Sequence, residues 1–491
     1  MKNILRYTLA ICTAGLLPVA CTSNFDEYNT NQNQMEMGDI HPLNLLEHIL
    51  FTGADGMVYR TWLLNNELVQ YTVQMYTENV HRYMIRDSYN SGTWNHLARW
   101  AANSDHMIEQ AVKNEDANSE AIALTMRALF VSNWTDIYGD IPFSEAFQGR
   151  NNVLKPKFDT QKEIYTQLFA DLERANSLYD SSRALRYPNK DLMYAGDIAK
   201  WRKFTNSLYM RLLMRLQNHD AEMGVSEKLR EIVSNPTLYP VMASNADNAA
   251  LFYTNVDPFI GRFGTMTLQN FTSNSHRMAE HLVNMMNNTN DPRLGIYAVQ
   301  QNNEWTGLVS GYPTTETNAT NCAYLNKDVL GDYTSPYTFM RYDEVLFILS
   351  EAAFRGMVPG GSGAAQQYYE QAVLASIDYW DEINPSPTYE ITQAQKNAFM
   401  QIVAFDNTLE QILNQHYIAL FWEGYEAWHE YRRTGYPNLK IGKGTANDGV
   451  LPTRFIYPVT TVDTNHENYL KAIANQGPDN MKTRLWWAPK Q

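Results

Sequence analysis

Cysteine is scarce in this chain of 491 residues, which contains only three. Two of them, Cys12 and Cys21, lie close to the N-terminus, so Cys322 is the single thiol in the rest of the chain. One thiol cannot form an internal disulfide, and no group of cysteines is present to bind zinc. The fold must therefore be stabilised by a large packed core.

Basic residues are also outnumbered, since 39 Lys and Arg stand against 53 Asp and Glu, for a net charge of −14. A chain with this excess of acid is unsuited to non-specific binding of nucleic acid or anionic lipid. Aromatic residues, in contrast, are abundant, with 31 Tyr and 11 Trp. Many of these rings must lie at or near the surface.

Sequence motifs of the common catalytic sites are missing. The chain has no G-x-S-x-G, no G-x-x-x-x-G-K-[ST] and no G-x-G-x-x-G. The nearest candidate is ALFWEGYEAWHEYRRTGYP at 419–437, within a helix expected over 408–434. Its His429 is followed by Arg433 where a zinc-protease helix needs a second histidine, and a guanidinium cannot bind zinc.

The same stretch places Glu423, Glu426 and Glu430 at a spacing that would put them on one helix face. Paired carboxylates are the groups that glycoside hydrolysis requires, which leaves a hydrolase as an alternative. Arg432 and Arg433 lie beside them, and buried ion pairs between helices are the commoner role of such residues.

The first 20 residues have the pattern of a signal peptide, with Lys2 and Arg6 before an apolar run that is too short to span a membrane. Cys21 follows a small residue, as in a bacterial lipoprotein, where this cysteine carries the lipid. Lipidation at Cys21 would hold the protein on a membrane without a transmembrane helix, and plain secretion is the alternative. Residues 21–40 are polar and predict a tether.

Helical spacing dominates residues 41–491, which we interpret as a single domain. Apolar residues recur at three- and four-residue steps in the segments 119–142, 159–180 and 199–219. Consecutive amphipathic helices with short turns favour helix pairs of the tetratricopeptide kind, and a bundle without repeats is the alternative. Two long segments, 244–275 and 297–340, lack this spacing and predict loops, and the last fifty residues predict extended segments that close over the helices.

The stretch at 419–437 closely resembles the C-terminal signature of the SusD/RagB family of nutrient-binding outer-membrane lipoproteins of Bacteroidetes, in its SusD-like type 2 branch. Further landmarks occur in family order across the chain: FDEYNTNQNQ, NWTDIYGDIPFSEAFQG, PKFDTQKEIYTQLFADLERA, GDIAKWRKFTNSLYMRLLMR, NDPRLGIY, RYDEVLFILSEAAFRG and PTRFIYP.

The resemblance implies a mainly α fold, in which a tetratricopeptide-like scaffold of helix pairs carries additional helices, long loops and a few short strands. It implies a lipid-anchored protein of the outer membrane that faces the cell exterior and has neither a cofactor nor a catalytic activity. Such a protein captures oligosaccharides and delivers them to a partner SusC-like TonB-dependent transporter. Peptide binding on the same scaffold is the alternative.

Ligand residues vary within the family, so the binding site must be predicted from chemistry. A sugar ring stacks on Trp or Tyr, while Asn, Asp and Arg bind its hydroxyl groups. Exposed rings of this kind are expected in two regions, 78–94 and 297–340, and packing in the core is the alternative for each ring. The predicted ligand residues are Tyr83, Arg86, Asp87, Tyr89, Trp94, Trp305, Tyr312, Tyr333 and Tyr337. Oxygen-rich loops leave a structural calcium site open, although no EF-hand pattern is present.

Overall fold

The computed structural model describes residues 40–74, 79–273, 276–313 and 321–489. Within it, Pro42–Gln491 forms one compact unit. The predicted signal peptide, Cys21 and almost all of the predicted tether lie outside the described residues. None of the helices in the described ranges is both long and apolar enough to cross a membrane.

The described part of the chain is mainly α-helical, as predicted, with eighteen α-helices. They are α3 (Pro42–Arg60), α4 (Asn66–Leu68), α5 (Asp87–Lys113), α6 (Ala117–Tyr138), α7 (Gln161–Leu178), α8 (Ile198–Arg215), α9 (Asp220–Met223), α10 (Val225–Ser234), α11 (Glu280–Asn288), α12 (Leu294–Tyr297), α13 (Lys327–Leu330), α14 (Tyr342–Phe354), α15 (Gly361–Glu382), α16 (Gln393–Ile402), α17 (Leu409–Ala419), α18 (Glu426–Thr434), α19 (Val459–Thr464) and α20 (His466–Gln476).

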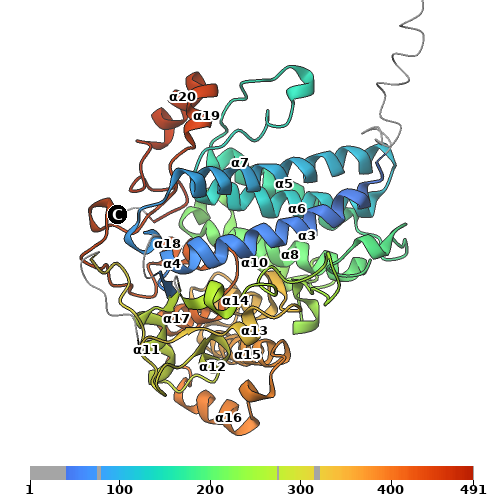
Figure 1. The fold of residues 1–491 in the computed structure, drawn as a ribbon. Coiled ribbons are helices and arrows are strands. Elements are labelled where there is room, and N and C mark those ends of the chain that lie inside the picture. Colours follow the sequence, from blue (N-terminus) through green and yellow to red (C-terminus); the bar gives the residue numbers. More distant parts are fainter. Residues whose placement is uncertain (1–39, 75–78, 274–275, 314–320, 490–491) are drawn as a thin grey trace, which may run out of the picture. The chain divides into compact units, whose positions relative to one another are not determined.

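Helices that follow one another in sequence pack as pairs. Helix α5 packs on α6, α7 on α8, and α14 on α15. Figure 1 shows α5, α6 and α7 running side by side, and α6 contacts both of its neighbours. Three-residue and six-residue connections join α5 to α6 and α14 to α15. Short connections of this kind produce the stacked helix pairs that the sequence predicts.

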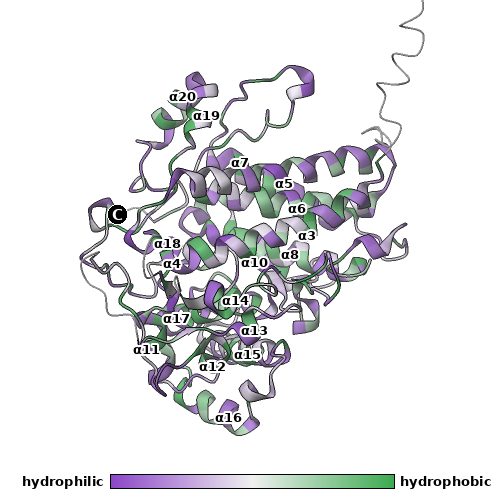
Figure 2. Ribbon diagram, viewed as in Figure 1, coloured by the Kyte–Doolittle hydropathy of each residue, from purple (hydrophilic) through white to green (hydrophobic). Residues whose placement is uncertain are grey.

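The apolar stripes of the sequence form the core of these pairs. In α7, Ile164, Leu168 and Leu172 are buried at four-residue steps, and Thr160 with Glu163 forms a capping box at the start of the helix. Helix α6 is buried on nearly all sides, because α5 and α7 cover it. Figure 2 shows hydrophobic and hydrophilic residues on the same helices, as amphipathic packing requires.

Short strands connect the irregular segments. They are β1 (Thr72–Val73), β2 (Ala249–Leu251), β3 (Arg277–Met278), β4 (Ala298–Val299), β5 (Tyr324–Leu325) and β6 (Tyr337–Met340). All pairs are antiparallel, in a four-stranded sheet of order β1-β3-β5-β4 and a two-stranded sheet of β2 and β6. The larger sheet joins segments that are far apart in sequence, and β3 leads directly into α11.

The prediction of extended structure for the last fifty residues is wrong in part. Helices α19 and α20 occupy Val459–Thr464 and His466–Gln476. Within α20 only Ala472 is buried. Tyr469 and Ile473, four residues apart in α20, are partly buried against the core, so the helical spacing is present in the sequence and the prediction passed over it.

Candidate functional site

The signature stretch does not form the single helix that its spacing predicts. Trp422 and Gly424 have φ angles of 71° and 50°, left-handed values that do not occur within an α-helix. The chain therefore turns between α17 and α18, and Glu423 lies before α18, which carries Glu426 and Glu430. The expectation that all three carboxylates share one helix face is wrong.

Glu423 is buried between two arginines from other helices. Its Oε1 accepts a hydrogen bond of 2.9 Å from Arg211, and its Oε2 lies 2.8 Å from Nη1 of Arg341. Arg211 also donates to Glu344 at 2.5 Å, so one guanidinium serves two carboxylates. These contacts tie α8 and α14 to the turn before α18.

The two carboxylates of α18 are paired in the same way. Arg215 of α8 binds Glu426 and lies 3.0 Å from Glu430. Arg433 contacts Glu430 at 2.5 Å and Glu351 of α14 at 2.5 Å. Arg433, which stands where a zinc-protease helix needs its second histidine, thus holds α18 and α14 together. The part of the chain that the structure describes contains no group of three or more His, Cys, Asp or Glu placed to bind a metal.

Burial and pairing separate the pKa values of these acids. Burial raises the pKa of Glu423, although Arg341 opposes it. Burial acts in the same direction on Glu430, but Arg433 holds the pKa of that carboxyl at about 2. Two acids with separated pKa values are typical of a general acid and base, so the space available to a substrate beside Glu423 decides their role.

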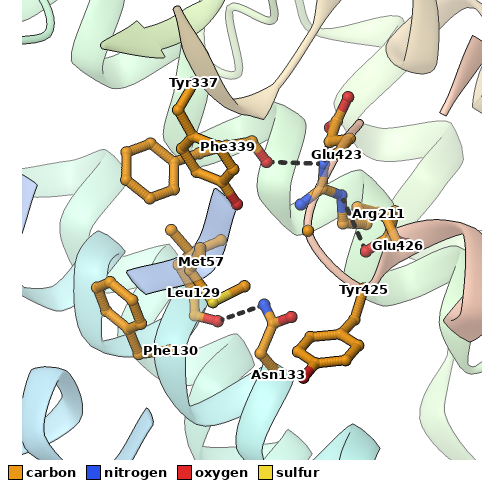
Figure 3. A pocket seen from close by; sticks show the side chains of 11 residues that line it. Met57, Leu129, Phe130, Asn133, Arg211, Tyr337, Phe339, Glu423, Tyr425 and Glu426 are labelled. Carbon is orange, nitrogen blue, oxygen red and sulfur yellow. Dashed lines mark hydrogen bonds and ion pairs between the residues drawn. The ribbon is translucent and has the colours of Figure 1, made fainter. Parts of the chain in front are cut away.

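That space is too small for a sugar. Figure 3 shows Arg211 reaching the carbonyl of Phe339 and the carboxylate of Glu426, with Tyr337 and Tyr425 closing the surroundings. The cavity among these side chains measures about 20 Å³, which is room for roughly one water molecule. We conclude that the signature stretch forms a buried ion network between helices, which we call the arginine seam.

Region 78–94 places some of its predicted ligand residues in the core. Tyr83 has a φ of 62° and is 1% exposed. Trp94 is buried within α5, with Trp134 edge-on to it at 4.8 Å. The expectation that these two rings are exposed on a loop is wrong. Trp94 lies on the buried face of α5, and Tyr83 is buried at the end of a 3-10 turn, Val80–Arg82, that precedes the helix. Arg86 and Asp87 are exposed and Tyr89 is half-buried, so the prediction for these three residues stands untested.

Region 297–340 divides in a similar way. Tyr337 is 2% exposed, since β6 runs through the core, and the expectation of exposure is wrong for this ring. Tyr333 is 40% exposed and lies against Gly264, where an added Cβ would stand 2.7 Å from the ring. Trp305 is half-buried. Tyr312 is 8% exposed, so the expectation of exposure is wrong for this ring as well, because His81 stacks on it.

Although their rings differ in exposure, the structure does bring the two predicted regions together. Arg82 donates from Nε to the carbonyl of Tyr312 at 2.7 Å. The backbone N–H of Gly311 donates to Nδ1 of His81 at 3.0 Å, and the His81 ring stacks on Tyr312 at 4.9 Å. The guanidinium of Arg82 lies 4.6 Å from the centre of the same tyrosine ring.

A third segment, 440–446, completes the arrangement and was not among the predicted regions. Gly444 donates to the carbonyl of Gly311 at 2.8 Å, and Ala446 to that of Arg82 at 2.7 Å. The side-chain amide of Gln70 donates to the carbonyl of Lys440 at 2.8 Å. Three stretches that are far apart in the sequence are thereby fastened to one another.

Helix α11, residues 309–313 and residues 440–443 line a cavity of about 570 Å³, which we call the three-segment cavity; Gln70 also contributes, and no residue of 78–94 does. This volume lies within the range of small-molecule sites. Its lining combines amides, a hydroxyl, cations and apolar side chains. The lining residues are Gln70, Glu280, His281, Asn284, Met285, Asn288, Val309, Ser310, Gly311, Tyr312, Pro313, Lys440, Ile441, Gly442 and Lys443.

Most of these residues were missed at the level of sequence. Tyr312 is the single predicted ligand residue in the lining. Helix α11 contributes Asn284 and Asn288 from a segment that has an ordinary helical pattern. The stretch NLKIGKGTANDG at 438–449, rich in Gly and Asn, has the composition of a functional loop and could have been singled out.

A second cavity, of about 280 Å³, lies on the other side of α11 and includes Trp305 and Tyr389. Met286 and Asn287 of α11 line this second cavity, whereas Asn284 lines the first. Asp291 and Glu390 make the surroundings of Trp305 acidic. A third cavity, of about 410 Å³, lies near α6 and α7 and includes Phe147.

Comparison with known proteins agrees with this architecture. A chitin-binding protein of known structure has a TM-score of 0.80 at 25% identity, covering 91% of this chain and 100% of its own. A SusD homologue from Bacteroides fragilis NCTC 9343 has a TM-score of 0.78 at 24% identity, over 92% and 100%. A chitin-binding SusD homologue from Flavobacterium johnsoniae has a TM-score of 0.76 at 23% identity, over 92% and 98%.

No curated protein sequence matches the chain. A family model does: that of SusD-like proteins, described as starch-binding and associating with the outer membrane, matches residues 32–458. With this match across most of its length, the chain belongs to the SusD-like family of glycan- and nutrient-binding proteins associated with the outer membrane.

Proposed function

We propose that the protein is a cell-surface lipoprotein that captures oligosaccharides in the three-segment cavity and delivers them to a SusC-like TonB-dependent transporter. The observation that carries the proposal is a cavity of about 570 Å³ that α11, the predicted region 297–340 and the segment 440–443 line together. Region 78–94 contributes no lining residue, but its Arg82 holds the carbonyl of Tyr312 in the cavity wall. Family membership and the likeness to chitin-binding proteins support the choice of a glycan.

The lining suits a carbohydrate. Gln70, Asn284 and Asn288 supply amide donors and acceptors for hydroxyl groups. Met285 and Ile441 supply apolar surface for the C–H faces of a sugar ring, and the buried ring of Tyr312 borders the cavity. A peptide bound as an added strand would need a long sheet edge, and the strands of the larger sheet have two residues each.

The other accessible residues among the predicted ligand residues lie outside the three-segment cavity and would contact only parts of a glycan that extend beyond it. Trp305 lies across α11 in the second cavity and would contact a longer glycan. Arg86, Asp87, Tyr89 and Tyr333 are exposed or half-buried and would contact ligand only beyond the three-segment cavity.

Isothermal titration of the purified protein with a panel of starch- and chitin-derived oligosaccharides and plant and host glycans tests the proposal. We expect at least one glycan to bind, and Asn284→Ala to weaken that binding about tenfold, because a hydrogen bond to a hydroxyl group would be lost. Asn397→Ala is the matched control, since Asn397 is also an exposed helical asparagine and lies outside the cavity. Absence of binding to every glycan would contradict the proposal.

The proposal also predicts that bound glycans are released intact. A chromogenic glycoside should not be turned over by the wild-type protein, because Glu423 has no room for substrate beside it. Turnover that disappears in Glu423→Gln would instead support a hydrolase.

Membrane attachment and the partner are tested in the native host. Cys21→Ala should abolish incorporation of labelled fatty acid and release the protein from the outer membrane. Affinity purification of the wild-type protein should recover a TonB-dependent transporter, and its absence would contradict the delivery step.

A further inference from the structure

We propose that the three-segment cavity takes an anionic glycan, whose carboxylate or sulfate group lies against the side chains of Lys440 and Lys443. This inference rests on the proposed function and specifies its substrate class. It starts from an imbalance of charge in the lining, where two lysines face one carboxylate, that of Glu280.

The lysines of this cavity have no acidic partner in the described part of the chain. Among the residues that the structure describes, neither Lys440 nor Lys443 forms an ion pair, and both are exposed. The chain as a whole carries a net charge of −14, with more acidic than basic residues. Two lysines without a carboxylate partner at the edge of one cavity are therefore unexpected from the composition. Unpaired cations at a concave site attract anionic ligands and hold them.

The other large cavities lack this property. In the cavity near α6 and α7, Arg127 is paired with Asp105 at 2.6 Å and with Asp171 at 2.8 Å, and Lys157 lies 3.0 Å from Asp159. The cavity beside Trp305 has Asp291 and Glu390 in its lining and no lysine or arginine. Cations without counter-charges are therefore specific to the three-segment cavity among these three.

The backbone holds the two lysines in place. An added Cβ at Gly442 would stand 2.3 Å from the carbonyl oxygen of Ser310, and one at Gly444 would stand 2.5 Å from that of Tyr312. Only glycine permits this approach, so the loop lies flat against 310–312 on both sides of Lys443. Lys440 is anchored through its carbonyl by Gln70.

Helix α11 provides groups that suit the rest of an acidic sugar. Glu280, Asn284 and Asn288 follow one another at four-residue steps and so share one face of the helix. The two amides can bind ring hydroxyls, while Glu280 in the first turn disfavours a second negative group near it. His281 adds an Nε2 that has no hydrogen-bond partner among the described residues.

A pair of lysines can bind either of two kinds of anionic sugar, one with a carboxylate and one with a sulfate. An ammonium group is a compact charge without the fork geometry by which arginine selects planar carboxylates. A uronic acid and a sulfated sugar share the chemistry that this pair recognises, and the experiment must separate them.

The test uses the full-length protein in detergent and three probes of equal length: tetragalacturonate, which has carboxylates and no sulfate, a sulfated carrageenan tetrasaccharide, which has sulfates and no carboxylate, and neutral chitotetraose. We expect one of the two anionic probes to bind at least tenfold more tightly than chitotetraose. Raising NaCl from about 0.05 M to about 0.5 M should weaken the binding of the anionic probe and leave the affinity for the neutral probe unchanged, because salt screens exposed charges.

The double variant Lys440→Gln, Lys443→Gln should bind the preferred anionic probe about tenfold or more weakly than wild type. The matched control is Lys155→Gln, Lys471→Gln, which removes two exposed lysines outside the cavity and should leave the affinity unchanged. Thermal unfolding of both variants checks that they fold.

Each remaining outcome overturns the inference. If neutral glycans of the proposed-function panel bind and neither anionic probe binds better, the inference fails while the proposed function stands. If an anionic probe binds equally well to the Lys440→Gln, Lys443→Gln variant, the anion site lies elsewhere. If no glycan of either panel binds, or an acidic peptide binds in their place, the proposed function fails as well.

Discussion

Two charged stretches, one with Arg433 in the arginine seam and one with Lys440 in the three-segment cavity, lie within about twenty residues of each other in the sequence. They differ in whether the fold supplies a partner for each charge. In the arginine seam, Arg433 meets Glu430 and Glu351, and Arg211 meets Glu423 and Glu344. In the three-segment cavity, Lys440 and Lys443 meet no carboxylate among the described residues.

The comparison shows that charge density is a poor guide to function. The seam has the residue types of an active site and the pKa separation of an acid–base pair, but about 20 Å³ of space. The cavity has an ordinary composition and about 570 Å³. Charges that are paired within the fold stabilise it or specify its geometry, and charges left without a partner at a concave surface are available to a ligand.

The largest effect should come from breaking the seam. Arg211→Met leaves Glu344 and Glu423 buried without their shared guanidinium, and the free energy of unfolding should fall by about 3–5 kcal/mol. Urea denaturation followed by circular dichroism measures this loss. Lys471→Met on α20 should stay within about 0.5 kcal/mol of wild type; a loss below about 1 kcal/mol in Arg211→Met would show that the seam contributes little.

The stability of the same variant should depend on pH. Burial raises the pKa values of Glu344 and Glu423 above the ordinary 4.5, so the folded state binds more protons and stability is lost as pH rises from 4.5 through the folded pKa values. Removing Arg211 raises both pKa values further. The deficit of Arg211→Met should therefore shrink by about 1–2 kcal/mol between pH 8 and pH 5. A deficit that is constant with pH would contradict this.

A smaller effect on stability, with a large effect on binding, is expected at Gly442. The methyl group of Gly442→Ala would meet the Ser310 carbonyl oxygen at 2.3 Å and push the loop off 310–312. We expect the glycan affinity to fall about tenfold or more, which corresponds to about 1.4 kcal/mol. Gly363→Ala in α15 is the control, since nothing lies within 4 Å of its added Cβ. Equal affinities in wild type and both variants would show that the position of the loop does not affect glycan binding.

The smallest effect should be at Trp305, across α11. Trp305→Ala should lower the affinity for a hexasaccharide about threefold through loss of stacking and leave the affinity for a disaccharide unchanged. Titration calorimetry measures both affinities. A loss for the disaccharide would move the main site to the second cavity. Trp305 is half-buried, so the variant should remain folded.

Much of the scaffold could be predicted from periodicity. Ile164, Leu168 and Leu172 are buried at the spacing that identifies them, and Thr160 caps the helix they belong to. The prediction of one helix across 408–434 was wrong because Trp422 and Gly424 adopt left-handed φ angles, and a tryptophan gives no sequence signal for such an angle.

The candidate site was only partly predictable. Composition identified the regions that contain His81, Arg82 and Tyr312, and tertiary contacts join them. Composition could not separate exposed from buried rings. Four rings that were expected on the surface are buried: Tyr83, Trp94, Tyr312 and Tyr337. The side on which an irregular segment packs depends on distant neighbours and not on its own spacing.

By itself, the sequence determined the family, the helical class and the need for a core without disulfides, because apolar spacing and motif order are local properties of the chain. Only the tertiary structure decided which charges are neutralised and which are free. Arg433 and Lys440 are both cations in one stretch of chain, and what differs is the surface that folding brings against each of them. That surface comes from distant segments, 82 residues away for Glu351 beside Arg433 and 370 for Gln70 beside Lys440, whose approach is set by the packing of the whole core.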